Sequence, residues 1–229
     1  MAWLADQLHT RNLLFGLYMA GSSLNCAPYL GLHTGSLYRE DDDAQVLASW
    51  RIDSLHYDNC GDNHLDMGAR AAAMRDALNR TGREILFMAE PFYADPQPDL
   101  PAIMNVADET WVDICSSRTC QNNLKFHPPG TPQPTGLLWP NCSCWYSVLD
   151  NIDHNERWNA LAEPGFFPGA DYLIVGDHVL SPAETEAHFS LWVISKSPLI
   201  HGGDVRSFSP AILAMVNNPE LLEIHQARQ

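Results

Sequence analysis

Three acidic side chains stand at or near the ends of successive apolar segments of the chain: Asp58, Glu90 and Asp113. If these segments are parallel strands, their carboxyl ends form the rim where α/β folds build their sites. A single carboxylate at such a place can equally cap a helix or bind a loop amide. Three on successive strands favour a functional site.

Two carboxyl groups suffice for glycoside hydrolysis, one as an ionised nucleophile or base and one as the acid that protonates the leaving oxygen. The main alternative is a divalent metal site, in which carboxylates and His56 would hold the ion. Sugar sites place aromatic faces against the carbons of the ring. Aromatic residues lie at or beside the same strand ends: Tyr18, Tyr57, Phe92, Tyr93 and Trp111. Each alone is typical of a core, but together they favour a sugar.

Apolar runs alternate with amphipathic segments, as expected of alternating strands and helices. The strand candidates are 13–19, 52–58, 85–90, 110–115, 171–176 and 198–204. The helix candidates are 3–10, 40–50, 66–79, 145–152, 182–195 and 209–216. Ser181-Pro182 with Glu184 predicts a capped start for the fifth helix. Because parallel strands need crossovers, which are usually helices, the pattern predicts a parallel sheet.

A barrel is favoured over an open nucleotide-binding sheet, because no Gly-x-Gly-x-x-Gly turn follows any strand candidate. A (β/α)8 TIM barrel usually takes about 250 residues. We therefore expect residues 1–229 to form a partial TIM-barrel catalytic domain, with about six of the eight strands and the first two missing. The segment 119–144 is rich in Pro and Gly and contains Cys120, Cys142 and Cys144. It predicts a long irregular loop insertion.

The charge balance excludes some partners. With 28 acidic and 13 basic residues the net charge is −15, and no Lys or Arg cluster offers a face for nucleic acid. The longest uncharged apolar stretch, from Leu13, is shorter than the roughly 20 residues of a membrane span. Six cysteines without zinc-type spacing favour disulfides. With sequons at Asn79 and Asn141, they favour an oxidising secretory compartment, although the first residues read as helix rather than as a signal peptide.

Several short motifs follow one another along nearly the whole chain. They are Leu14-Phe-Gly-Leu-Tyr18, Gly35-Ser-Leu-Tyr38, Asp43-Ala44, Tyr57-Asp-Asn-Cys60, Leu78-Asn-Arg-Thr-Gly-Arg83, Trp145-Tyr-Ser-Val-Leu149, His188-Phe-Ser-Leu-Trp192 and Lys196-Ser-Pro-Leu199. This series resembles the alpha-galactosidases of glycoside hydrolase family 27. The resemblance implies a TIM barrel that removes terminal alpha-linked galactose with retention of configuration. It implies an alpha-galactoside as substrate, and neither a cofactor nor a metal ion is expected.

The resemblance also implies roles for individual residues. Asp58 falls at the nucleophile and Tyr18 at a tyrosine that contacts the substrate. Glu90 falls at the acid that binds the 2-hydroxyl, which favours galactose over N-acetylgalactosamine. Asp171 falls at a further sugar-binding aspartate. His56 replaces a lysine of this substrate site, and a histidine is cationic only when protonated, which predicts activity shifted towards acid.

The acid/base position depends on how the chain is aligned with the family. In the preferred register Asp113 is the acid/base, although the family arginine before it is missing. In the other register Arg118 matches that substrate-binding arginine and Asn122 replaces the acid, which would leave no proton donor. A second departure lies near Asp171, where Gly169 replaces an aspartate and Phe167 a tryptophan.

The resemblance predicts further features of the whole protein. Cys26 and Cys60 fall at a disulfide between two rim loops, while the pairing of the other four cysteines stays open. The expected location is secreted, lysosomal or vacuolar, and a homodimer is one assembly compatible with the family. Two N-terminal strands and a C-terminal β domain of the family have no counterpart in this chain, so we expect it to be inactive or poorly stable alone.

Overall fold

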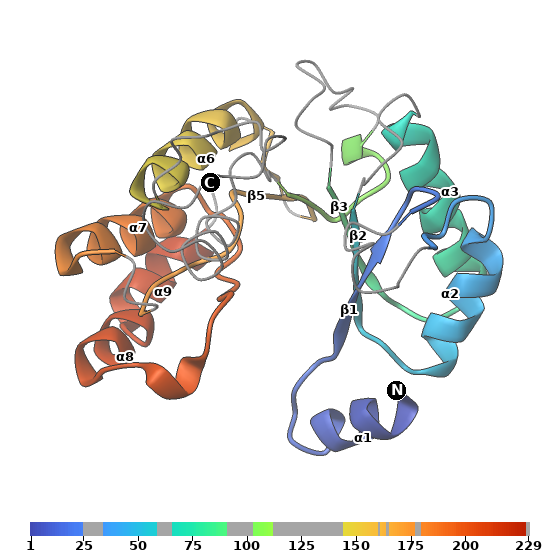
Figure 1. Ribbon diagram of the computed structural model, residues 1–229, viewed down its shortest axis with the longest axis horizontal. Helices are drawn as coiled ribbons and strands as arrows, with labels where there is room; N and C mark the ends of the chain where they lie inside the picture. Colours follow the sequence, from blue (N-terminus) through green and yellow to red (C-terminus); the bar gives the residue numbers. More distant parts are fainter. Residues whose placement is uncertain are drawn as a thin grey trace, which may run out of the picture. The chain divides into compact units, whose positions relative to one another are not determined.

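The computed structural model describes residues 1–24, 34–58, 66–90, 103–111, 144–159, 161–163, 165–176 and 180–227. Within these ranges the side chains of residues 111, 144–147, 150, 154 and 157 are not described. The single domain expected over residues 1–229 divides into two compact units, Met1–Trp111 and Val112–Gln229. Figure 1 shows both units.

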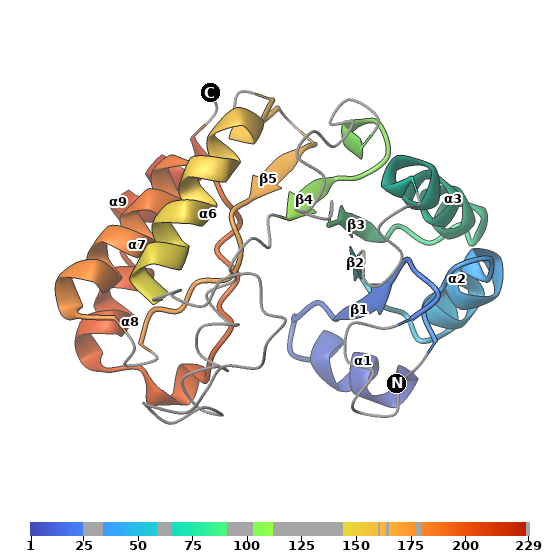
Figure 2. The same cartoon turned by 45° about the horizontal axis from the view of Figure 1, so that its top comes forward.

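The first unit is built on a parallel sheet. Its described strands, β1 (Gly16–Ala20), β2 (Ser54–Asp58), β3 (Leu86–Ala89) and β4 (Glu109–Trp111), lie side by side in chain order. All three neighbouring pairs are parallel, which confirms the predicted parallel sheet. Helix α1 (Ala2–His9) precedes β1, while α2 (Glu40–Ser49) and α3 (Met67–Arg80) connect successive strands. In both views α2 and α3 lie along the same side of the sheet (Figures 1 and 2).

Alternation of side chains gives this sheet two different faces. One face packs against α2 and α3 in an apolar core that includes Leu47, Leu55, Tyr57, Ala71, Met74, Phe87 and Ala89. Residues between these strand positions, such as His56 and Met88, are not part of that core. They point to the opposite side, which we call the site face.

The amino-terminal end of the sheet is held by one partly buried ion cluster. Asp53 accepts hydrogen bonds from His9 Nε2 at 2.7 Å, from the Phe15 N–H at 2.8 Å and from Arg83 at 2.6 Å. Arg83 also donates to the Ile52 carbonyl at 2.7 Å. Burial alone would raise the pKa of Asp53, but these hydrogen bonds and the charges of His9 and Arg83 lower it. The cluster fixes the starts of β1 and β2 and so sets where both strands end.

The second unit is mainly helical. It contains α6 (Cys144–Asn159), β5 (Phe167–Gly169), α7 (Pro182–Ile194), the 3-10 helix η2 (Val205–Ser207), α8 (Pro210–Val216) and α9 (Pro219–Gln226). Figure 2 shows α6, α7 and α9 side by side. Their core includes Val148, Leu173, Ile174, Val175, Phe189, Trp192 and Val193. Ser181 caps α7 in a reciprocal capping box with Glu184, as the sequence predicts.

Residues of the last two sequence motifs hold the segment that follows β5. Trp192 Nε1 donates to the carbonyl of Asp171 at 2.7 Å. The N–H of Ile174 donates to His188 Nε2 at 3.1 Å, and the N–H of Ala170 donates to Ser197 Oγ at 2.8 Å. Buried backbone groups need such partners outside regular structure. These motifs therefore have a structural role in the second unit.

Two predicted strands are wrong. Residues 171–176 form no strand beyond an isolated bridge between Leu173 and His201, and the strand of this region is β5, which ends at Gly169. The backbone explains the difference, because Asp171 and Gly176 have φ of 82° and 83°, outside the strand region. Residues 198–204 contribute only the same bridge, and Asp204 caps η2.

The helix predictions differ from the structure mainly in extent. The helix expected at 145–152 runs to Asn159. Helix α9 was not expected, although Asn218 caps it and Pro219 occupies its first position, which is a readable start signal. Cys144, expected in the loop insertion, begins α6. The rest of that insertion, residues 119–143, lies outside the described residues.

Candidate active site

The strand register of the first unit aligns four side chains in one row on the site face. Tyr18 lies opposite His56, His56 opposite Met88, and Met88 opposite Glu109. Residues paired in a parallel sheet point to the same side. Asp58 lies two residues beyond His56, at the carboxyl end of β2, so it points to the site face too.

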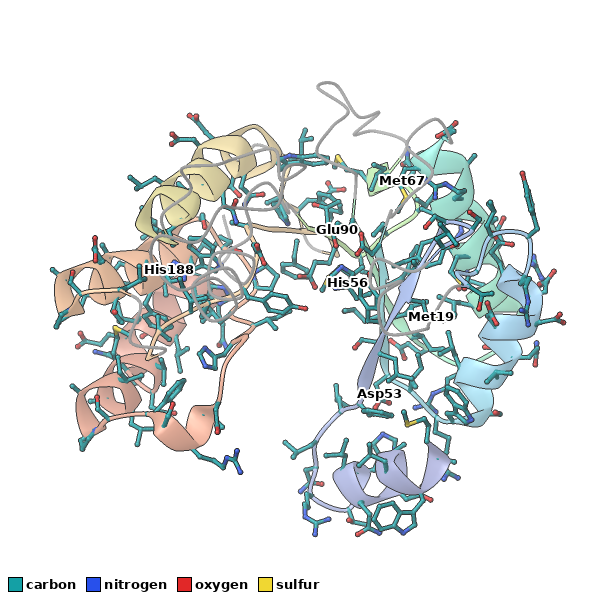
Figure 3. The ribbon with its side chains drawn as sticks, viewed as in Figure 1. Met19, Asp53, His56, Met67, Glu90 and His188 are labelled. Atoms are coloured by element: carbon teal, nitrogen blue, oxygen red, sulfur yellow. The ribbon has the colours of Figure 1, made fainter. Side chains whose placement is uncertain are left out.

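Two polar contacts link these side chains. The Tyr18 hydroxyl donates to a carboxylate oxygen of Asp58. His56 Nε2 lies 2.6 Å from Glu90 Oε2, and the two side chains are only 14% and 8% exposed. Figure 3 shows these two side chains turned towards each other beside the sheet. The rings of Tyr18 and His56 meet edge to face, with centroids 5.4 Å apart. Four of the predicted site residues thus lie together.

Burial decides the protonation of His56. It lowers the pKa of the imidazole to about 4, because a charged ring loses its hydration in such a place. Near pH 7 the ring is therefore neutral, and with its proton on Nε2 it donates to the Glu90 carboxylate. The family lysine would be cationic at this pH, whereas His56, with a pKa of about 4, becomes a cation only near pH 4 and below.

The backbone around Asp58 is fixed by its neighbours. Its carbonyl accepts from the N–H of Gly21 at 2.6 Å, and the carbonyl of Gly21 accepts from the buried guanidinium of Arg70 at 2.6 Å. A Cβ at Gly21 would lie 2.5 Å from Cε1 of Tyr57. Glycine is therefore needed where the chain leaves β1 for the rim.

Glu109 is a site-face acid that the sequence analysis did not select. It lies at the start of β4 and is 5% exposed. Burial, with a smaller effect of the neighbouring Asp108 carboxylate, raises its pKa to about 8. Glu109 was missed because it lies one residue before the predicted strand 110–115 and so looks like a loop residue. The alternation of side chains along β4 is the signal that could have placed it on the site face.

Asp171 lies in the second unit. It lies two residues beyond the end of β5 rather than starting a strand, whereas Asp58 is the last residue of β2. Its side chain is buried and accepts from Asn151 Nδ2 at 3.3 Å and from the N–H of Tyr172 at 2.5 Å. Its role in sugar binding stays a prediction.

Five residues with predicted roles lie outside the described residues. They are Cys26, Cys60, Asp113, Arg118 and Asn122. Both registers for the acid/base and the expected disulfide therefore stay predictions.

Within the described ranges, no three side chains of His, Cys, Asp or Glu gather as a metal site requires. No helix of the same ranges is both long and apolar enough to cross a bilayer. The described site consists of acidic groups at the carboxyl ends of neighbouring parallel strands, with a tyrosine bound to one of them. This arrangement is the type of site found in barrel glycoside hydrolases.

Comparison with known proteins identifies the family. The family model described as alpha galactosidase A matches residues 1–120 and 141–227. The chain therefore belongs to the alpha-galactosidases of glycoside hydrolase family 27. The solved structures similar to it are TIM barrels, which confirms the predicted fold class. The unmatched residues 121–140 fall within the expected loop insertion.

Individual relatives agree with this assignment. The chain is similar to an alpha-galactosidase of Oryza sativa subsp. japonica, with 31% identity over 97% of this chain and 46% of the relative. It is 33% identical to an alpha-galactosidase of Lachancea cidri, over 99% of this chain and 47% of the relative. The structure of the Saccharomyces cerevisiae enzyme with raffinose superposes with a TM-score of 0.73 at 26% identity, over 98% of this chain and 49% of that one. The chain thus spans about half the length of these relatives.

Proposed function

We propose that this chain forms part of the catalytic domain of a retaining alpha-galactosidase, with Asp58 as its nucleophile. The observation that carries the proposal is the position of Asp58. It ends a parallel strand, receives a hydrogen bond from Tyr18 and shares the site face with the His56–Glu90 pair. The relative from Saccharomyces cerevisiae was solved with raffinose, an alpha-galactoside, which supports the same class of substrate.

The proposed reaction has two displacements. The Asp58 carboxylate attacks the anomeric carbon, the bond to the aglycone oxygen breaks, and an acid delivers a proton to that oxygen. Water then attacks the glycosyl-enzyme ester, the same acid group takes the proton of the water as a base, and Asp58 leaves as a carboxylate. Asp113 is our candidate for this acid, from the preferred sequence register.

The described contacts assign supporting roles. The Tyr18 hydroxyl orients the Asp58 carboxylate through a hydrogen bond to one of its oxygens, and Tyr18 is 42% exposed, so that it can also contact a ligand. Glu90 would accept a hydrogen bond from the sugar 2-hydroxyl. His56 holds the Glu90 carboxylate through the contact of its Nε2 with Glu90 Oε2. Because the imidazole is neutral, it orients that carboxylate without cancelling its charge.

The test is hydrolysis of an aryl alpha-galactoside by this chain fused to the N-terminal strands of a family relative, and by the Asp58→Asn variant of that fusion, with galactose binding measured in parallel. We expect the substitution to abolish turnover by several orders of magnitude and to leave binding nearly unchanged, because asparagine keeps the shape and the acceptor for Tyr18. Asp76→Asn, on the exposed side of α3, removes the same charge far from the site face and should change neither. Turnover by Asp58→Asn at the level of the unsubstituted fusion would exclude the proposed role.

A galactose-binding protein without hydrolytic activity is the second candidate. It is favoured by Gly169, which replaces a family aspartate within β5, and by the neutral His56 in place of a lysine. Both changes remove charge from the family's pattern. Calorimetry that shows galactose binding, together with no turnover in the assay above, would support this candidate over the enzyme.

We also propose a secreted or lysosomal location, a disulfide between Cys26 and Cys60, and a homodimer. The six cysteines and the two sequons support the oxidising compartment, while the pairing and the dimer rest on family membership. Free-thiol counting on denatured, unreduced protein tests the disulfide, and reactive Cys26 or Cys60 would contradict it. Light scattering during size-exclusion chromatography tests the dimer.

A further inference from the structure

Glu109 stands out among the buried acids of the first unit. It begins β4, lies opposite Met88 in the register and therefore points to the site face, in the row that contains Tyr18 and His56. Continuing the register, Glu109 lies on the strand beside Glu90 and two residues closer to the amino end. At the rise of a β-strand this is about 7 Å lower along the strand.

One carboxyl oxygen of Glu109, the buried Oε1, has no hydrogen-bond partner among the described residues. A buried polar atom without a partner destabilises a fold, and such atoms are few in native proteins. A group of this kind is retained where it serves a function or where water or a ligand completes its bonding.

The protonation of Glu109 suits one kind of ligand. With a pKa raised to about 8 by burial and by Asp108, the side chain is mostly a neutral carboxylic acid near pH 7. A neutral carboxyl group offers one O–H donor and one carbonyl acceptor. A sugar hydroxyl also donates and accepts one hydrogen bond each, so the two groups are complementary without an ion.

We infer that Glu109 is a further substrate-binding residue, which forms the floor of the sugar site below Glu90 and hydrogen-bonds a hydroxyl of the bound galactose. This inference rests on the proposed function and extends it by a residue on a third strand. Glu90 would bind a hydroxyl near the rim, whereas Glu109 would bind the hydroxyl that reaches deepest into the site face. The chain would thereby bind two hydroxyls of the sugar, one with the ionised Glu90 and one with the protonated Glu109.

The experiment compares galactose binding and thermal stability for Glu109→Leu and Glu109→Gln. For Glu109→Leu we expect a higher melting temperature, because the unsatisfied polar atom is gone, together with galactose affinity weaker by about tenfold, the loss of one good hydrogen bond. Glu109→Gln keeps a donor and an acceptor and should recover most of the affinity. If Glu109 had a purely structural role, Glu109→Leu would raise the melting temperature and leave the galactose affinity unchanged.

Thr110→Val is the matched control. Thr110 is the next residue on β4, its Oγ1 is also buried without a partner among the described residues, and it lies opposite Ala89 on the face that packs against the helices. This substitution should raise the melting temperature and leave galactose affinity unchanged.

Unchanged affinity in Glu109→Leu, with normal binding by the unsubstituted chain, would overturn this inference and leave the proposed function intact. Equal loss of affinity in Thr110→Val would also overturn it, because the effect would then be general to the strand. No binding of galactose by the unsubstituted chain would refute the proposed function, and this inference with it.

Discussion

In the first unit a buried histidine, whose pKa is lowered, and a buried glutamic acid, whose pKa is raised, lie on the same face of one sheet, whereas the second unit buries a histidine with a lowered pKa, His188, on α7. His56 and Glu109 share a row of the site face. In the second unit His188 is fully buried, its Nε2 accepts from the Ile174 N–H, and its Nδ1 has no partner among the described residues. Burial, with a smaller effect of His201, lowers the pKa of His188 to about 3.

The difference teaches how a fold can tolerate buried titratable groups. A lowered histidine pKa makes stability fall as the pH decreases, because the unfolded chain then binds more protons than the folded one. A raised glutamic acid pKa has the opposite sign, since the folded chain holds the proton more tightly. The first unit therefore combines two opposite pH dependences, and the second unit carries the pH dependence of His188.

The variant with the largest expected effect on stability is Trp192→Ala in the second unit. Trp192 is fully buried in the core of α7 and donates to the Asp171 carbonyl at 2.7 Å. We expect the free energy of unfolding of the second unit to fall by about 3–5 kcal/mol, the usual cost of truncating a buried aromatic residue. Hydrogen exchange of α7 amides, compared with those of α3, measures the loss unit by unit.

Two milder variants sharpen this test. Trp192→Phe keeps most of the volume but leaves the Asp171 carbonyl without its donor, so it should still destabilise the second unit. Tyr57→Phe in the first unit removes a hydroxyl that has no partner among the described residues and should cost little. Equal faster exchange in α3 and α7 after Trp192→Ala would show that the units do not unfold separately.

The second test compares how the stability of each unit changes when the pH is lowered. Between pH 7 and 5, the pKa of about 3 for His188, against 6.5 in the unfolded chain, should cost the second unit about 2 kcal/mol. In the first unit His56, with a pKa of about 4, loses stability over the same range. Glu109, with a pKa of about 8 against 4.5, gains stability as the pH falls from 8 to 4.5 and offsets that loss with a small excess.

Hydrogen exchange at pH 7 and pH 5, corrected for intrinsic rates, reports this difference between α7 and α3. In His188→Gln, which keeps an acceptor but does not titrate, the acid sensitivity of α7 should disappear. Parallel weakening of both helices in the unsubstituted chain would contradict the compensation that we describe for the first unit.

The smallest expected effect compares the two helix caps. Ser181→Ala removes the side-chain acceptor of the Glu184 N–H in the capping box of α7 and keeps the bond from its own backbone N–H to the Glu184 carboxylate, and Asp66→Ala removes the side-chain acceptor of the Ala69 N–H in α3. Each removes one side-chain cap bond and should cost about 1 kcal/mol. Chemical denaturation monitored by hydrogen exchange resolves such differences, and a negligible cost at Ser181 would mean that packing alone holds the start of α7.

The fold of the first unit was largely predictable from the sequence. Apolar runs located β1, β2 and β3, because this signal is local, and for the same reason the cap residues Ser181 and Glu184 located the start of α7 in the second unit. The second unit was harder. Its segment 170–176 is as apolar as a strand, yet the left-handed backbone at Asp171 and contacts from His188, Trp192 and Ser197 hold it in an irregular path. Such tertiary contacts leave no periodicity in the sequence.

The candidate site was predictable where a residue ends a strand and not where it starts one. Asp58 and Glu90 follow apolar runs, and Tyr18 and His56 sit in recognisable motifs. Glu109 precedes its run, so its burial and its place beside Met88 become visible only through the register of β3 and β4. The protonation of His56 likewise depends on burial, which composition does not report.

The row on the site face has one apolar member, Met88, between His56 and Glu109. Its flexible thioether tolerates replacement better than a branched side chain would, and both polar neighbours come within reach of whatever replaces it. In laboratory evolution of sugar preference, a library at position 88 would therefore change the surroundings of His56 and Glu109 at the same time without replacing either residue.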